Sequence, residues 1–145
     1  MSSNKISKIR EDYNRAKIDF DNLSENPIQM FNDWFRMAVA SDEQDAICFV
    51  LSTVALDSTP SSRVVLLREI NQKGFIFFTN YNSSKSKDIR VNSMVCANFF
   101  WKSLEKQVRI TGKAHKISEK DSDRYFDSRP RKSQLAALAS DQSSV

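Results

Sequence analysis

Glycine and proline are scarce in this 145-residue sequence, which contains 2 Gly and 3 Pro. A G-x-G-x-x-G dinucleotide motif and a Walker-type phosphate loop both need several closely spaced glycines, so neither can occur here. Any phosphate group must therefore be held by side chains and by the N-terminus of a helix. The shortage of glycine also argues against a Rossmann fold.

Histidine and cysteine are almost as rare. His115 is the single histidine of the sequence, so a histidine-based metal site or a Ser-His triad would depend on one residue in a polar segment. Cys48 and Cys96 each lie in an apolar, strand-like run and are predicted to be buried, reduced thiols. No apolar run approaches the roughly 18 residues that a membrane-spanning helix needs. We therefore predict a cytoplasmic protein with no metal site and no membrane association.

Charge is distributed unevenly along the chain. Residues 63–132 contain 16 Lys/Arg and 7 Asp/Glu, a net charge of +9, whereas the remaining residues have a net charge of −5. The basic part is expected to attract anions. Its aromatic residues fall in strand-like runs and are predicted to form core rather than to stack on bases, which favours a small phosphate compound over nucleic acid. A basic nucleic-acid-binding barrel is the alternative that the charge pattern alone suggests.

The hydrophobic pattern predicts helices followed by a sheet. A first helix is indicated by apolar residues at helical spacing, namely Ile6, Ile9, Tyr13 and Ala16. Asn26 and Pro27 provide the N-cap and the first position of a second helix. We assign residues 1–45 to an N-terminal helical segment and residues 46–145 to a sheet domain. Strands are predicted at residues 46–55, 62–68, 75–80, 94–101 and 107–117.

The connections between these strands determine how the strands pair. Turn-forming clusters at residues 57–60 and 71–74 are too short to contain a crossover helix, so antiparallel pairing is expected. Ser83 or Ser84 is expected to cap a short helix that reaches about Val91. Two further helices are predicted at residues 118–126, after a sequence like a capping box, and at residues 130–139, where a proline opens the helix. The fold class is therefore mainly β with flanking helices (α+β).

Several segments in a fixed order resemble the pyridoxamine 5′-phosphate oxidases, flavoenzymes that bind FMN in a split β-barrel dimer. The resemblance runs from Arg10 to Val145 and is carried by residues 63–68, 74–80, 99–101, 104–108, 128–134 and 141–144. It implies an antiparallel split β-barrel of the FMN-binding type and a homodimer. Family members continue into a Trp-containing strand and an Arg-Leu-His signature, so the chain is expected to lack the C-terminal strands.

The resemblance implies FMN as the cofactor. It assigns the FMN phosphate to Arg63, to Lys85 and to the turn at Ser83 and Ser84, and a guanidinium, a second cation and a helix N-terminus together suit a dianion. The alternative for both cations is a solvated position at the surface. Ser84 replaces an arginine that is usual in the family, so weaker FMN binding is expected. The other implied cofactor contacts are Val64, Val65, Leu66, Leu67, Phe78, Thr79, Gln107, Gln142 and Ser143.

These contacts differ in kind. Val64, Val65 and Leu66 are expected to act mainly through the backbone. Gln142 and Ser143 are expected to come from the other subunit of the dimer. For Phe78, core packing is an alternative that is compatible with a flavin contact.

The resemblance also assigns the substrate-binding residues. Those for the substrate phosphate are Arg68, Tyr125, Arg129 and Ser133, and Arg10 and Tyr13 belong to a segment that can close over the substrate. Tyr125 and Arg129 would share one helical face if the helix at residues 118–126 extended a little further. Arg68 replaces the family's usual lysine, which keeps the charge but changes the geometry. For Tyr13, packing of the first helix is an equally good explanation.

The resulting hypothesis is an FMN-dependent oxidase of vitamin B6 metabolism. It would convert pyridoxamine 5′-phosphate or pyridoxine 5′-phosphate to pyridoxal 5′-phosphate, with hydride transfer from C4′ to the flavin and O₂ as the acceptor. The sequence offers no general base, and no catalytic side chain is assigned. The alternative is a non-catalytic flavin-binding split-barrel protein, which the early end of the chain favours.

Overall fold

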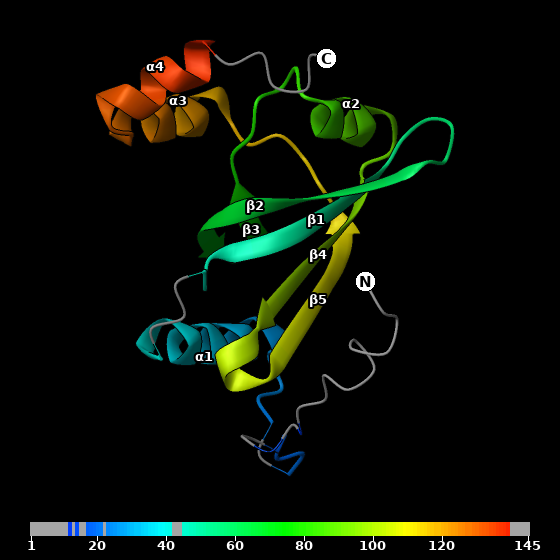
Figure 1. Ribbon diagram of the computed structural model, residues 1–145, viewed down its shortest axis with the longest axis vertical. Helices are drawn as coiled ribbons and strands as arrows, with labels where there is room; N and C mark the ends of the chain where they lie inside the picture. The colour runs from blue at the N-terminus through cyan, green and yellow to red at the C-terminus, as the bar shows by residue number, and fades with distance from the viewer. Residues whose placement is uncertain (1–11, 13, 15–16, 22, 42–44, 140–145) are drawn as a thin grey trace, which may run out of the picture. The chain divides into compact units, whose positions relative to one another are not determined.

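A computed structural model describes residues 12, 14, 17–21, 23–41 and 45–139 of the chain. Its helices are α1 (Pro27–Ala40), α2 (Ser84–Val91), α3 (Glu119–Ser128) and α4 (Arg131–Ala139), with a 3-10 turn, η2, at Lys102–Leu104 (Figure 1). Its strands are β1 (Cys48–Val54), β2 (Pro60–Asn71), β3 (Gly74–Phe77), β4 (Met94–Trp101) and β5 (Lys106–Lys113). None of the helices in these residues is long and apolar enough to cross a membrane.

The five strands form one sheet in the order β3-β2-β1-β4-β5. Strands β1 and β2 are an antiparallel hairpin in which Val50 lies opposite Val64 and Thr53 lies opposite Ser61. Strand β1 also pairs with β4, and β2 with β3, both antiparallel. The predicted α+β class with an antiparallel split-barrel sheet is confirmed.

Some predicted boundaries are wrong. The strand expected at residues 75–80 ends at Phe77, because Asn80 starts a turn in which its carbonyl accepts from the Ser83 N–H at 3.2 Å. The strand expected at residues 62–68 is longer and spans Pro60–Asn71, and the one expected at 107–117 ends at Lys113. The residues that define the first predicted helix lie outside the described residues.

The chain divides into two compact units, residues 1–46 with 100–108 and residues 47–99 with 109–145. In the first unit, Asn26 caps α1 through its side-chain oxygen, which accepts from the Ile28 N–H at 2.9 Å. Phe31 on α1 packs against Trp101, with ring centroids 5.6 Å apart. Trp101 is completely buried, and its indole N–H donates to the Ala46 carbonyl at 2.9 Å. Satisfying the one polar group of a buried indole keeps this aromatic core stable.

The second unit has its core on one face of the sheet. Phe49 and Phe99 stack with ring centroids 4.9 Å apart. Leu51 and Leu67 are also buried and point to the same face of the sheet, because side chains alternate between the two faces along each strand. Helix α2 lies in contact with β1. Because side chains alternate across a strand, Arg63 shares the face of its core neighbour Leu67, whereas Val64 points to the opposite face and is 63% exposed.

Candidate functional site

Arg63 on β2 is fixed by neutral oxygen atoms. Its Nη1 group donates to the Thr53 hydroxyl at 2.8 Å and to the carbonyls of Leu51 and Ser61, both at 3.2 Å. Its Nη2 group donates to the Ser61 hydroxyl at 2.6 Å. Among the described residues, no acceptor contacts Nε and no carboxylate pairs with the guanidinium. The guanidinium is therefore held in place, while its Nε–H group remains available to donate and no direct ion pair neutralises its charge.

Lys85 in the first turn of α2 is the second cation of this site. Its Nζ donates to the Thr79 hydroxyl at 3.0 Å, and the side chain is half-buried. Burial lowers the pKa of the Lys85 ammonium, and the positive charge of Arg63 lowers it further. Both effects penalise the charged lysine, so an anion bound between the two cations would relieve the repulsion.

The N-terminus of α2 is next to Lys85, which is the second residue of this helix. Ser83 is the N-cap, but its hydroxyl is buried and donates to the Asn80 carbonyl at 2.7 Å instead of capping the helix. The N–H groups in the first turn of any helix have no intrahelical acceptor and attract anions. Ser84 is exposed at this end. The three elements predicted for a phosphate site, namely a guanidinium, a lysine and a helix N-terminus, therefore occur on β2 and α2 of one unit.

Strand β2 also presents unpaired backbone. Strand β3 pairs with β2 only from Leu67 onward, so in the part of the chain that the structure describes no strand covers that edge of β2 at residues 63–66. Unpaired strand edges carry free N–H and C=O groups. This arrangement suits the backbone contacts expected of Val64, Val65 and Leu66, whereas the side chain of Leu67 belongs to the core.

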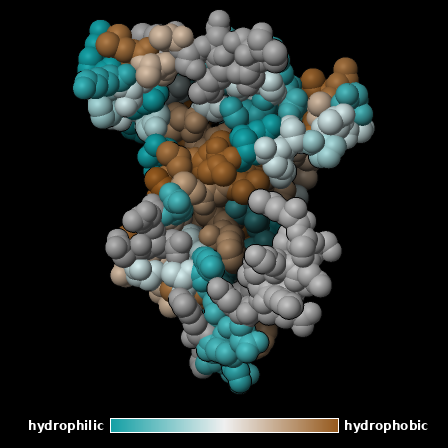
Figure 2. Space-filling view, viewed as in Figure 1, coloured by the Kyte–Doolittle hydropathy of each residue, from teal (hydrophilic) through white to brown (hydrophobic). Residues whose placement is uncertain are grey.

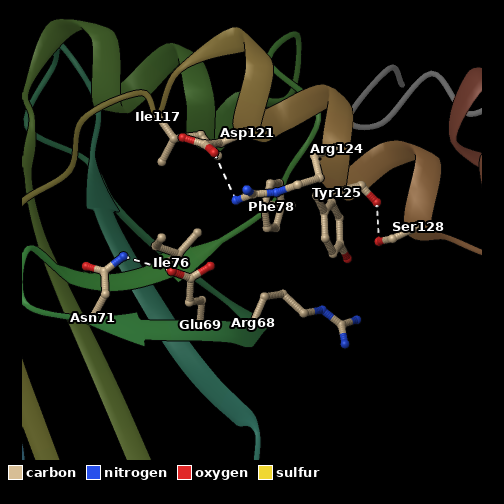
Figure 3. Close-up of a pocket in the computed structure, with 10 residues that line it drawn as sticks. All are labelled: Arg68, Glu69, Asn71, Ile76, Phe78, Ile117, Asp121, Arg124, Tyr125 and Ser128. Atoms are coloured by element: carbon tan, nitrogen blue, oxygen red, sulfur yellow. Dashed lines mark hydrogen bonds and ion pairs between the residues drawn. The ribbon is translucent and has the colours of Figure 1, made fainter.

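A cavity of about 420 Å³ lies between the β2–β3 hairpin and α3 (Figure 3). It is lined by Arg68, Glu69, Asn71, Ile76, Phe78, Ile117, Asp121, Arg124, Tyr125 and Ser128. Arg68 extends from β2 on the side toward which the hydroxyl of Tyr125 points (Figure 3). The cavity is lined mostly by polar and charged side chains, with Ile76, Phe78 and Ile117 as its apolar part, so it suits a small charged ligand.

Phe78 connects the cavity to the cationic site. Its ring stacks on Tyr125 with centroids 3.5 Å apart and planes 9° from parallel. The next residue is Thr79, whose hydroxyl accepts from Lys85. Phe78 therefore lines the cavity, and the adjacent Thr79 contacts the cation of the neighbouring site.

The other predicted site residues are not all brought together. Arg129 and Ser133 are half-buried but do not line the cavity. The shared face of Tyr125 and Arg129 stays a prediction: α3 extends past residue 126 to Ser128, and Arg129 is its C-cap, with φ −77° and ψ 146°. Gln107 lies on an exposed position of β5 in the other compact unit. Arg10, Tyr13, Gln142 and Ser143 lie outside the described residues.

Sequence reasoning missed several polar residues of the site. Thr53, Ser61 and Asp88 surround Arg63, and Arg124 lines the cavity in an ion pair with Asp121 at 2.9 Å. The turn at residues 57–60 could have indicated Thr53 and Ser61, because a hairpin around this turn places the two residues opposite each other. The described residues contain no cluster of three or more His, Cys, Asp or Glu side chains that could hold a metal ion.

Comparison with known sequences yields one family. A sequence model described as pyridoxamine 5′-phosphate oxidase matches residues 35–145. A pyridoxine/pyridoxamine 5′-phosphate oxidase of Flavobacterium johnsoniae is 47% identical over 145 residues, covering 98% of this chain and 67% of the relative. One from Acaryochloris marina is 45% identical over 140 residues, covering 97% of this chain and 64% of the relative. The chain thus spans about two-thirds of the length of the curated relatives it matches.

Solved structures agree on the fold. A crystal structure of PhzG from Burkholderia lata, in complex with tetrahydrophenazine-1-carboxylic acid, superposes with a TM-score of 0.83 at 25% identity. It covers 86% of this chain, which spans 62% of that protein. A pyridoxamine 5′-phosphate oxidase-related, FMN-binding protein from Nostoc punctiforme superposes with a TM-score of 0.62 at 17% identity, covering 79% of this chain and 63% of that one. The second likeness concerns the fold alone.

Proposed function

Because the chain belongs to the pyridoxamine 5′-phosphate oxidase family, we propose that it binds FMN and oxidises pyridoxamine 5′-phosphate or pyridoxine 5′-phosphate to pyridoxal 5′-phosphate, with O₂ as the acceptor. The observation that carries the proposal is the pair Arg63 and Lys85. These two cations lie close enough for one to lower the pKa of the other, and no carboxylate pairs with Arg63 among the described residues. Such a pair suits a dianionic phosphate.

The residues present fit FMN. Arg63 would hold the phosphate through its remaining N–H groups, with Lys85 and the N-terminus of α2 supplying further positive potential. The uncovered edge of β2 at residues 63–66 would meet the polar edge of the ligand through the backbone. Phe78 and Thr79 would lie beside the ring and the ribityl chain. When bound, FMN supplies the redox chemistry, accepting a hydride and passing electrons to O₂.

The chain itself would position the substrate and exclude water. Arg68 would hold the substrate phosphate, and Tyr125, whose ring is fixed against Phe78, would contribute its hydroxyl to the same cavity. The stacked rings would cover one side of the reacting groups, and a dry, oriented site favours the transfer. No side chain is assigned as an acid or base.

The test is an aerobic assay on the FMN-loaded chain. With pyridoxamine 5′-phosphate we expect pyridoxal 5′-phosphate and H₂O₂ in equal amounts, and with unphosphorylated pyridoxamine a far lower rate. Bound flavin without product would instead indicate a non-catalytic flavin-binding protein. A chain that binds no flavin at all would contradict the assignment of the cationic site.

We further propose that two copies of the chain form a homodimer. On the sheet face opposite Arg63, apolar side chains are exposed in the described part of the chain, with Val64 63% exposed and Met94 43% exposed, and Figure 2 shows apolar side chains gathered in the region of β1 and β2. Val64→Asp is expected to give monomers in light scattering, whereas Gln72→Asp, in the exposed β2–β3 turn, keeps the dimer. A wild-type monomer that binds FMN stoichiometrically would overturn the proposal.

The lowered pKa of Lys85 predicts a pH dependence. The lysine is charged below this pKa and neutral above it, so the affinity for FMN relative to riboflavin is expected to fall as the pH rises through it. The free energy of unfolding of the ligand-free chain should change in the opposite sense. It is expected to rise as the pH increases from the lowered pKa to the ordinary value of 10.5, because the unfolded chain binds more protons than the folded chain in this range.

Flavin titrations above about pH 7.5 test this, since a phosphate monoester with a second pKa of about 6 keeps its charge there. The control is Lys85→Arg, which stays protonated, so the fall should disappear. An equal fall in that variant would assign the effect to another group.

A further inference from the structure

We propose that Thr53 and Asp88 are positioning residues for Arg63, joined to it through hydroxyl groups so that the guanidinium is oriented but its charge stays available to a phosphate. This inference rests on the proposed function, in which Arg63 holds the phosphate of FMN. It adds two residues, on β1 and α2, that touch neither cofactor nor substrate in that assignment.

Thr53 is the centre of this arrangement. It is completely buried, and its hydroxyl donates to Asp88 Oδ2 at 2.7 Å while accepting from Arg63 Nη1 at 2.8 Å. A carboxylate can only accept and a guanidinium can only donate, so the single hydroxyl hydrogen must point to Asp88. The lone pairs of the same oxygen then face Arg63. A hydrogen bond to a carboxylate polarises the hydroxyl and strengthens its acceptance from the arginine.

Ser61 forms a second, parallel connection. It lies opposite Thr53 in the β1–β2 register, accepts from Arg63 Nη2 at 2.6 Å and donates to Asp88 Oδ2 at 3.3 Å. Two hydroxyls therefore separate the carboxylate from the guanidinium, and no direct ion pair between Asp88 and Arg63 occurs among the described residues. A direct pair would use the donors of Arg63 and cancel its charge, whereas the hydroxyl spacers fix its plane and leave donors on Nε and Nη2.

The same bonds fix helix α2 relative to the strands. Asp88 lies three residues after Lys85 on α2, so its contacts with Thr53 and Ser61 tie that helix to both strands of the hairpin. The N-terminus of α2 and the ammonium of Lys85 are thereby held at a set distance from Arg63. A phosphate site that needs all three groups at once depends on this distance, because binding groups are most effective when they are already in place.

The substitution Thr53→Val tests the proposal, because valine keeps the shape and removes the hydroxyl. We expect the affinity for FMN to fall about tenfold, from the loss of one hydrogen bond to a charged group, while the affinity for riboflavin stays within about twofold. Thr53→Ser keeps the hydroxyl and should restore FMN binding. The matched control is Ser52→Ala, which removes the hydroxyl that bonds Ser62 at 2.8 Å on the other face of the same hairpin; it should change neither affinity.

Measuring Arg63→Ala in parallel distinguishes the positioning role of Thr53 from the assignment of the FMN phosphate to Arg63. If Arg63→Ala lowers the FMN affinity selectively but Thr53→Val does not, the positioning role is overturned and the phosphate site stands. If Arg63→Ala lowers the affinities for FMN and riboflavin equally, the phosphate assignment itself fails.

A variant on α2 covers the case in which Thr53→Val does not fold. Asp88→Ala alters a half-buried helix position and is expected to give the same selective loss of FMN. An unchanged ratio of the FMN and riboflavin affinities in that variant would overturn the proposal.

Discussion

Arg63→Ala is expected to weaken FMN binding about ten- to a hundredfold, corresponding to roughly 1.5–3 kcal/mol for a lost charged partner, and to leave riboflavin binding nearly unchanged. The two ligands differ in the phosphate, which is the group assigned to the Nε side of this arginine. Within the described chain, the contacts of Arg63 use only Nη1 and Nη2. Quenching of flavin fluorescence in titrations with each ligand measures both affinities.

The control for this experiment is a cation of the same segment outside the site. Arg90 on α2 is exposed and donates to the Tyr81 carbonyl at 3.4 Å, so Arg90→Ala should leave both affinities unchanged. Equal losses of FMN and riboflavin in Arg63→Ala would mean that Arg63 holds the β1–β2 hairpin together and not the phosphate.

Arg68→Ala is expected to raise the KM for pyridoxamine 5′-phosphate about ten- to a hundredfold, from the same loss of roughly 1.5–3 kcal/mol at a phosphate, while FMN affinity stays unchanged. Arg68 is exposed and lines the cavity with Tyr125 (Figure 3). Initial rates of pyridoxal 5′-phosphate formation at varied substrate concentrations give the KM.

The two arginines serve as controls for each other. Arg63→Ala should act on FMN affinity and Arg68→Ala on the KM for the substrate, whereas Lys73→Ala, in the exposed turn between β2 and β3, should change neither. If the KM is unchanged in Arg68→Ala, the substrate phosphate lies elsewhere, and Arg124 in the same cavity becomes the next candidate.

Local features of the sequence predicted the elements that carry Arg63 and Lys85. Short turns between β-branched runs indicated an antiparallel sheet, and the serines before Lys85 indicated the start of a helix there. The helix that begins at Pro27 follows from its cap and its proline. The predictions of the strand pairing and of the helix at Pro27 succeed because turn chemistry and helix capping act over a few residues.

Features that depend on distant residues were not predicted. The hydroxyl connection from Asp88 to Arg63 needs the β1–β2 register and the packing of α2 on β1, neither of which a local pattern determines. The stack of Phe78 on Tyr125 joins residues 47 positions apart in the sequence. The end of α3 at Ser128 has a local reason, because Pro130 biases the residue before it toward an extended backbone.

The most direct test of the account is a single-turnover experiment without oxygen. The FMN-loaded chain is mixed with excess pyridoxamine 5′-phosphate, and the flavin absorbance near the visible maximum is followed. We predict loss of the oxidised flavin absorbance with one pyridoxal 5′-phosphate formed per FMN, and recovery of the absorbance when O₂ is admitted. Flavin that stays oxidised in the presence of saturating substrate would contradict the proposed oxidase function.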